Sequence, residues 1–163
     1  MIDSSDKSFE ENFLSYLYIL RNEFWEVNNF INTLKNYKPF VLDIRESTPI
    51  QNALNITVVI SYSRNFKKSY GFNNTNRINA ELTKYFTKEE NELHKTIISW
   101  RDQEYAHSDA IPNDVQIYND NKSSYSRRVV RQLLEKGQLE TLKIMVNKIR
   151  DEIEIQIKSL TKC

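Results

Sequence analysis

Glycine and proline are scarce in this chain of 163 residues, which contains two glycines and three prolines. A β-sandwich or β-barrel needs many tight turns, and glycine is the usual residue where such a turn requires a positive φ. A Rossmann or P-loop domain needs a glycine-rich loop that binds phosphate. The shortage of glycine therefore excludes both kinds of fold.

Cysteine and histidine are also rare. Cys163 is the only cysteine, so the chain forms no internal disulfide, which fits a reducing compartment. With only two histidines beside it, we recognise no zinc ligand set and expect no cofactor. Residues 1–10 lack the apolar region of a signal peptide, and the densest apolar run, Ile56–Ile60, is too short to span a bilayer. We therefore expect a cytoplasmic protein without membrane contact.

The charge is nearly balanced. The chain has 23 Lys and Arg against 22 Asp and Glu, which gives a formal net charge of +1. No global positive field is available to attract a nucleic acid, so any such contact must be local. Hydrophobic residues make up 39% of the chain, which is typical of a folded globular protein. The length predicts a single domain over residues 1–163.

A long first helix is predicted from the spacing of apolar residues by three and four. Ser8 and Glu11 form a capping-box pattern at its start, and the helix should end near Tyr37, before Pro39. Its apolar face consists of Phe9, Phe13, Leu17, Leu20, Phe24, Val27, Ile31 and Leu34. A stripe of this length must pack on other long helices.

A second helix is indicated by Thr48 at the N-cap, Pro49 at the first helical position and Gln51 at the third. It should extend to about Lys68. The β-branched residues of Ile56–Ile60 are also typical of a strand, but the clear cap and the length of the pattern favour a helix. Residues 40–46 before it are expected to be a connector, briefly extended.

A third, short helix and a fourth helix follow. The apolar positions of the short helix are Ile78, Leu82 and Tyr85. Thr87 and Glu90 form a capping-box pattern at the start of the fourth helix, which should continue toward His107. The apolar face of the fourth helix consists of Leu93, Ile97 and Trp100.

A small hairpin and a last helix complete the chain. Val115–Tyr118 alternates between apolar and polar residues, which is consistent with a hairpin in an otherwise polar segment. The last helix should begin between Arg127 and Gln138, with Leu139, Leu142, Val146, Ile149, Ile153, Gln156 and Leu160 along one face. We therefore predict an all-α fold, an antiparallel bundle of four main helices plus a short helix.

The end of the fourth helix carries the chemistry-bearing residues Arg101, Asp102 and His107. At 100° per residue, Arg101 and His107 flank the apolar stripe on opposite sides, about 120° apart. They can converge if the helix bends or if a second subunit supplies the opposite wall. A simpler interpretation is a histidine bonded to a helix-end carbonyl and an arginine in a solvated ion pair worth under about 1 kcal/mol.

The segment 101–109 reads Arg-Asp-Gln-Glu-Tyr-Ala-His-Ser-Asp and resembles the signature of the HEPN superfamily. In that signature an arginine and a polar residue precede a histidine, and the Ala-His-Ser-Asp form resembles HEPN proteins of the abortive-infection type. Ser61–Phe66 resembles a tyrosine–arginine–phenylalanine element of those proteins, and Leu93-His94 precedes the motif at a familiar interval. The resemblance covers most of the chain, about Phe9 to Leu160.

The resemblance implies a homodimer whose two motifs face each other, and a metal-independent endoribonuclease of the toxin or phage-defence kind. Arg101, Asp102 and His107 would then be catalytic. Histidine suits general acid or base chemistry on the RNA 2′-OH, and a guanidinium stabilises charge that grows on the phosphate. We assign Asp102 to orienting Arg101 or His107. The expected products are a 2′,3′-cyclic phosphate and a 5′-hydroxyl.

Arg64, Tyr62, Arg127 and Arg128 are the candidate RNA-binding residues. The alternative places Tyr62 in the core and Arg64 on the surface as an ordinary charge, and short basic clusters such as Arg127-Arg128 near the start of the last helix are mostly solvated surface. For His94, a structural role is favoured over RNA contact.

Two tryptophans are expected in the core or a dimer interface rather than under RNA bases. These are Trp25 and Trp100, which lie at apolar helical spacing.

Partners implied by the resemblance are an RNA substrate and an antitoxin or a nucleotidyltransferase. In some HEPN toxins a nucleotidyltransferase modifies a tyrosine two residues after the histidine, but Asp109 occupies that position here. Two other classes of function stay open. One is a catalytically inactive HEPN-like module that binds nucleotides or proteins, and the other is an unrelated four-helix interaction protein in which Arg101 and His107 are incidental.

Overall fold

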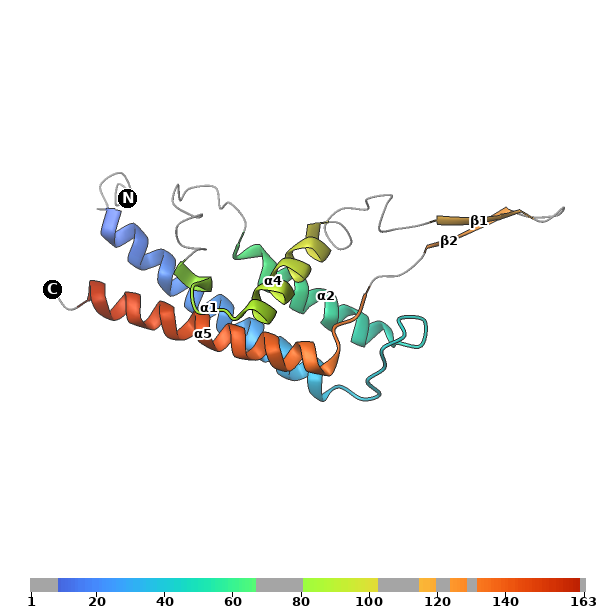
Figure 1. Cartoon of the computed structure of the whole chain (residues 1–163), viewed down its shortest axis with the longest axis horizontal. Coiled ribbons are helices and arrows are strands. Elements are labelled where there is room, and N and C mark those ends of the chain that lie inside the picture. Colours follow the sequence, from blue (N-terminus) through green and yellow to red (C-terminus); the bar gives the residue numbers. More distant parts are fainter. Residues whose placement is uncertain (1–8, 67–80, 103–114, 120–123, 129–131, 162–163) are drawn as a thin grey trace, which may run out of the picture.

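The computed structural model describes residues 9–66, 81–102, 115–119, 124–128 and 132–161. Its elements are α1 (Phe9–Asn36), α2 (Pro49–Arg64), α4 (Lys88–Trp100), β1 (Val115–Asn119), β2 (Ser124–Arg128) and α5 (Lys136–Leu160). Residues 81–83 add one helical turn ahead of α4. The described chain is mainly helical, as predicted, and β1 and β2 form an antiparallel hairpin that extends away from the helices (Figure 1).

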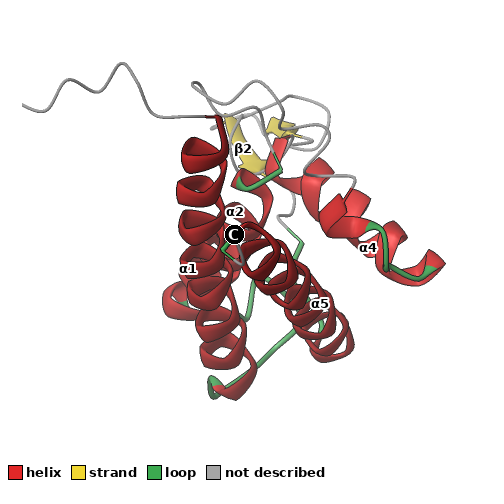
Figure 2. Ribbon diagram, turned by 90° about the vertical axis from the view of Figure 1, so that its left-hand side faces the viewer, coloured by secondary structure: helices red, strands yellow, loops and turns green. Residues whose placement is uncertain are grey.

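The two long helices α1 and α5 lie side by side and run in opposite directions (Figures 1 and 2). Polar contacts along their seam fix this pairing: Lys143 Nζ donates to Asn32 Oδ1 at 2.9 Å, and Arg21 pairs with Glu154 at 3.7 Å. Helix α2 packs on α1, and α4 contacts both α2 and α5. The arrangement encloses one hydrophobic core.

The apolar stripes predicted for the first and last helices are confirmed. In α1 the buried positions are Leu17, Leu20, Phe24, Val27, Ile31 and Leu34, and in α5 they include Leu139, Leu142, Val146, Ile149 and Ile153. Helix α1 ends at Asn36, before Pro39, and α5 begins at Lys136, inside the predicted interval. Ser8, which was predicted to cap the start of α1, lies outside the described residues.

The predicted start of α2 is confirmed, but Gln51 has a different role. The Thr48 hydroxyl accepts a hydrogen bond from the Gln51 N–H at 3.1 Å, with Pro49 at the first helical position. The Gln51 side chain does not complete a capping box. It is buried and bonds both the N–H and the carbonyl of Val41, so it holds the connector against α2. Residues 40–46 form bends and turns instead of the extended segment that was expected.

A second buried amide, Asn55, joins α2 to the segment before α5. Its Nδ2 donates to the Gln132 carbonyl at 3.2 Å, and its Oδ1 accepts from the Leu134 N–H at 2.9 Å. Unpaired backbone groups are costly when they are buried, so this asparagine fixes where the chain enters α5. Helix α2 ends at Arg64, short of the predicted Lys68.

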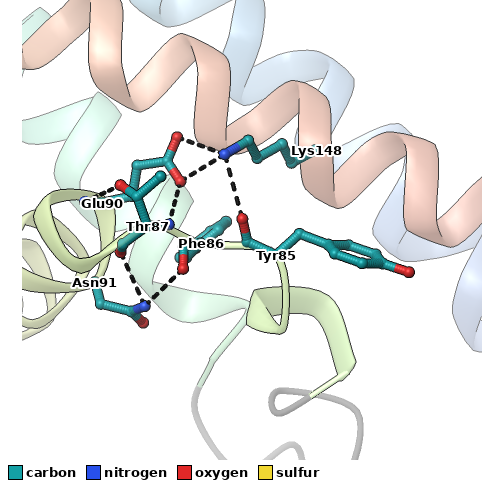
Figure 3. A network of polar contacts seen from close by, with 6 residues as sticks. All are labelled: Tyr85, Phe86, Thr87, Glu90, Asn91 and Lys148. Atoms are coloured by element: carbon teal, nitrogen blue, oxygen red, sulfur yellow. Dashed lines mark hydrogen bonds and ion pairs between the residues drawn. The ribbon is translucent and has the colours of Figure 1, made fainter.

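Helix α4 begins with the predicted capping box and is anchored to α5 at the same point (Figure 3). Thr87 and Glu90 exchange both bonds of the box, and the Glu90 carboxylate also accepts from Lys148 Nζ at 2.7 and 2.8 Å. Lys148 donates to the Tyr85 carbonyl as well. Burial alone would raise the pKa of the Glu90 carboxyl, but the hydrogen bonds from Lys148 and Thr87 outweigh it and lower that pKa.

Two predictions near the ends of helices need correction. Leu82 is buried, as predicted for the short third helix, but Tyr85 follows its last turn and is mostly exposed, while Ile78 lies outside the described residues. Arg127 and Arg128 do not lie near the start of the last helix, because they belong to β2. Among the described residues, none of the helices has the length and apolar character needed to cross a bilayer.

Candidate functional site

Arg101 and Asp102 lie where α4 leaves the core. The last two turns of α4 are held by Ile97 and Trp100, which are both buried. Beyond Trp100 the helical backbone continues into Arg101, whose N–H donates to the Ile97 and Ile98 carbonyls. The angle predicted between Arg101 and His107 involves residues outside the described ranges.

The Arg101 guanidinium is fixed by its neighbour. Its Nη1 donates to Asp102 Oδ1 at 2.8 Å, and the two side chains are 27% and 36% exposed. The Arg101 Nε is buried and has no hydrogen-bond partner among the described residues. The Asp102 carboxylate contacts Arg101, and its predicted role in orienting Arg101 or His107 during catalysis stays a prediction. His107 and Asp109 lie outside the described residues.

Tyr62 is a core residue, which corrects its assignment as an RNA-binding residue. Its side chain is 0% exposed and therefore offers no surface to RNA. Burial, with a smaller contribution from the Glu90 charge, raises the pKa of the Tyr62 hydroxyl well above its usual value, so the group stays neutral. The hydroxyl is 2.8 Å from Nδ1 of His94, which links α2 to α4.

His94 has the structural role that the sequence favoured. Its ring packs edge-on against Phe66, with centroids 4.6 Å apart, and against Phe86 at 5.9 Å. Burial, aided by the charge of Lys95, lowers the pKa of His94 to about 4, so the imidazole is neutral at neutral pH. A neutral imidazole with its proton on Nε2 accepts a hydrogen bond from the Tyr62 hydroxyl at Nδ1.

Arg64 lies on the surface beside α1. Its Nη2 is 3.3 Å from Glu23 Oε1, and its side chain is about half exposed. An exposed pair of this kind contributes little to stability and leaves part of the guanidinium accessible. The proposed RNA contact of Arg64 stays a prediction.

Arg127 and Arg128 lie in β2 of the hairpin. The register pairs Gln116 with Arg127 and Val115 with Arg128. The proposed RNA contacts of both arginines stay predictions.

The two tryptophans differ. Trp100 is buried in the core, as predicted. Trp25 is 55% exposed on α1, so it is not a core residue, and its predicted place in a dimer interface stays a prediction.

Within the part of the chain that the structure describes, no cluster of three or more His, Cys, Asp or Glu side chains is placed to hold a metal ion.

At the end of α4, the Arg101 guanidinium is the group that can bind a phosphate. Arg101 offers a permanently charged, planar donor group in a fixed orientation. Comparisons with family models, curated proteins and solved structures return no match to this chain.

Proposed function

We propose that the chain is a HEPN-like, metal-independent endoribonuclease whose composite active site forms between two identical subunits. The observation that supports this most is the Arg101–Asp102 pair at the end of α4, with the guanidinium oriented by the 2.8 Å bond and its Nε without a described partner. His107 follows six residues later, at the spacing of the HEPN signature. The bundle of four main helices suits that family.

The reaction uses the substrate's own nucleophile. His107 of one subunit removes the proton of the 2′-OH, and the 2′ oxygen attacks the adjacent phosphorus. The bond from phosphorus to the 5′ oxygen breaks, and that oxygen takes a proton from the second His107. Arg101 stabilises the charge that grows on the non-bridging phosphoryl oxygens. The products are a 2′,3′-cyclic phosphate and a 5′-hydroxyl.

The position of Arg101 depends on contacts along the whole of α4. Glu90 anchors the first turn to Lys148 of α5, and His94 anchors the middle to Tyr62 of α2. Ser63 Oγ adds a bond of 3.4 Å to the Ile97 carbonyl, one turn before Arg101. These anchors fix the end of the helix from which Arg101 projects. The same proposal includes a toxin or phage-defence role, with an antitoxin or a nucleotidyltransferase as a partner.

The test is RNA cleavage in the presence of EDTA. Wild-type protein, Arg101→Ala and His107→Ala are incubated with total RNA, and the ends of the products are analysed. We expect cleavage by the wild type with 2′,3′-cyclic phosphate ends, and a loss of at least about 100-fold in each variant because one donor to the developing charge or one proton carrier is removed.

Arg45→Ala is the matched control. Arg45 also pairs with a nearby aspartate, Asp43, but it lies on the exposed connector before α2. We expect this variant to cleave RNA as fast as the wild type. Arg101→Lys keeps the charge and loses the planar fork, so it should recover only a small part of the rate. Undiminished cleavage by His107→Ala, or a monomer in sedimentation equilibrium at the assay concentration, would refute the proposal.

A second candidate is a HEPN-like module without nuclease activity that binds nucleotides or proteins. The observation that favours it is that Arg64 and Arg101 are both in ion pairs, with Glu23 and Asp102, in a chain of almost balanced charge. A stable dimer that shows no cleavage of any RNA, with or without divalent cations, is the outcome that selects this candidate.

A further inference from the structure

Helix α2 differs from α1, α4 and α5 in charge. Its 16 residues include a single charged side chain, Arg64, which is the last of them. Toward the core it presents Val58, Val59 and Tyr62, which are fully buried. A surface helix normally carries charged or polar residues on its outer side, and a helix that lacks such a side is normally buried all round. The composition of α2 is therefore that of a helix whose outer side is covered as well.

The outer α2 face consists of Ile50, Ala53, Ile56, Thr57 and Ile60, which recur at intervals of three and four and so share one side of the helix. Ile50 is 60% exposed, Ala53 is exposed, and the other three are partly exposed. The Thr57 hydroxyl donates a hydrogen bond to the Ala53 carbonyl at 2.8 Å, so this donor is used inside the helix. The outer α2 face thus offers aliphatic groups and no unused polar donor.

Opposite charges lie at the two ends of α2. Arg64 ends the helix, and its side chain is about half exposed although Nη2 is 3.3 Å from Glu23 of α1. Glu46 is exposed and lies two residues before the N-cap, Thr48. At 1.5 Å per residue, the helix that separates the two charges is about 24 Å long. Within one chain, Arg64 and Glu46 are therefore too far apart to pair.

We infer that the outer α2 face is the surface through which two copies of this chain pair, with their α2 helices antiparallel about a two-fold axis at the level of Ile56 and Thr57. The inference rests on the proposed function for the presence of two identical subunits and on α2 for the surface that joins them. A two-fold interface uses the same patch on both subunits, so the patch must complement itself. Helix α2 does so in both size and charge.

In the antiparallel arrangement, residues at equal distances on either side of the axis become neighbours. Ile60 then lies against the partner subunit's Ala53, which places a large side chain beside a small one at each of the two contacts. Arg64 comes near the partner subunit's Glu46, so each end of the interface gains a pair of opposite charges. Such an interface has an apolar centre and a charged rim, as stable contacts between proteins have. The same uncharged face offers nothing to the phosphates of an RNA.

The dissociation constant of the dimer is measured on the full chain by sedimentation equilibrium. Ile60→Glu places a carboxylate in the apolar contact twice per dimer, and we expect the dissociation constant to rise at least about 100-fold. Ala53→Lys changes a position that is exposed in the single chain, so it leaves the fold intact and should raise the constant at least about tenfold.

Ile155→Glu is the matched control for these variants. Ile155 is an isoleucine of α5 that is 58% exposed, so it presents a similar group on another helix. This variant should dimerise within about twofold of the wild type because a surface substitution away from the interface changes little. Circular dichroism shows whether each variant keeps its helices.

A charge exchange tests the antiparallel orientation. Glu46→Arg and Arg64→Glu each place like charges together at both ends of the interface and should weaken dimerisation about three- to tenfold. The double variant restores opposite charges and should return to within about threefold of the wild type. The pair with Glu23 is lost both in Arg64→Glu and in the double variant, so that loss cancels in the double-mutant cycle. The length of α2 far exceeds the screening length of about 8 Å, so recovery reports a contact between subunits.

The outcomes separate this inference from the proposed nuclease. If the wild type is a dimer that cuts RNA while Ile60→Glu and Ala53→Lys dimerise as tightly as the wild type, the pairing through α2 is refuted and the nuclease stands. If dimerisation depends on these two residues but no cleavage occurs, the pairing stands and the nuclease is refuted. A monomeric wild type, an equal loss in Ile155→Glu, or no recovery in the double charge variant would also overturn the pairing.

Discussion

The contact between the buried Tyr62 and the partly buried His94 makes a sharp prediction about stability and pH. His94 has an ordinary pKa of 6.5, and burial together with the charge of Lys95 lowers this pKa to about 4 in the folded chain. The unfolded chain binds a proton on His94 near pH 6.5, whereas the folded chain does so only near pH 4. The stabilisation is therefore fully present above pH 6.5 and is lost as the pH falls toward 4.

The magnitude follows from the two pKa values. Between pH 7.5 and pH 5, the unfolded state gains almost a full proton on His94 and the folded state gains about a tenth of one. Linkage then lowers the free energy of unfolding by about 2 kcal/mol over this interval. The surroundings of the ring support this direction, since Phe66 and Phe86 pack against it and Tyr62 supplies a neutral hydroxyl.

The assay compares urea unfolding of the wild type and of His94→Leu at a series of pH values. Leucine does not titrate, but it leaves the buried Tyr62 hydroxyl without its acceptor, at a cost of about 1–3 kcal/mol at every pH. The variant is therefore expected to be less stable than the wild type at pH 7.5. The difference in the free energy of unfolding between the two proteins should shrink by about 2 kcal/mol when the pH is lowered to 5.

The carboxyl groups of the chain titrate in both proteins, so their contribution cancels when the free energies of unfolding are subtracted. The His94 ring resonance, identified by its absence from the spectrum of His94→Leu, should show no midpoint above about pH 5 in the folded wild type. Two results would show that the imidazole is not desolvated as the structure indicates. One is a difference in unfolding free energy that stays constant from pH 7.5 to 5, and the other is a titration midpoint of the His94 resonance near pH 6.5.

Three further predictions concern other contacts. Lys148→Met should lower the free energy of unfolding by about 1–3 kcal/mol, because the Glu90 carboxylate is only 7% exposed and loses its partner, and adding Glu90→Gln should recover part of this loss in urea titrations. Asn55→Leu should cost about 1–3 kcal/mol and speed hydrogen exchange at the Leu134 amide, which bonds to the Asn55 side chain; unchanged exchange would contradict that link. Trp25→Ala should change stability by less than about 0.5 kcal/mol because the ring is 55% exposed, so a large weakening of self-association measured by sedimentation would place Trp25 in the dimer interface.

The helices could be predicted because their signals are local. The N-caps at Thr48 and Thr87 depend on residues within one turn, and both caps are present in the structure. The stripe in α1 follows from a spacing that any α-helix imposes, and Leu17 through Leu34 are buried accordingly. A cap and a stripe together fix where a helix begins and which side it buries.

The contacts between helices could not be predicted because they join residues far apart in the chain. The sequence allows Tyr62 in the core and favours a structural His94, but only the packing of α2 on α4 shows that these two residues bond to each other. The sequence predicts Glu90 as a capping residue of α4, but its carboxylate also pairs with Lys148 of α5. The pairing of Tyr118 with Tyr125 in the hairpin register likewise joins residues of two different strands.

The difference between the two histidines of the chain gives the proposed chemistry a distinct signature. A folded His94 with a pKa of about 4 cannot produce a change in rate near pH 6–7. His107 is the only other histidine, so a midpoint near 6.5 in a pH–rate profile of RNA cleavage would report on His107. In His94→Leu the rate should fall as α4 loses its anchor to α2, while the midpoint of the profile stays in place. A midpoint that moves in His94→Leu would mean that His94, and not the histidine of the Arg–His motif, controls the reaction.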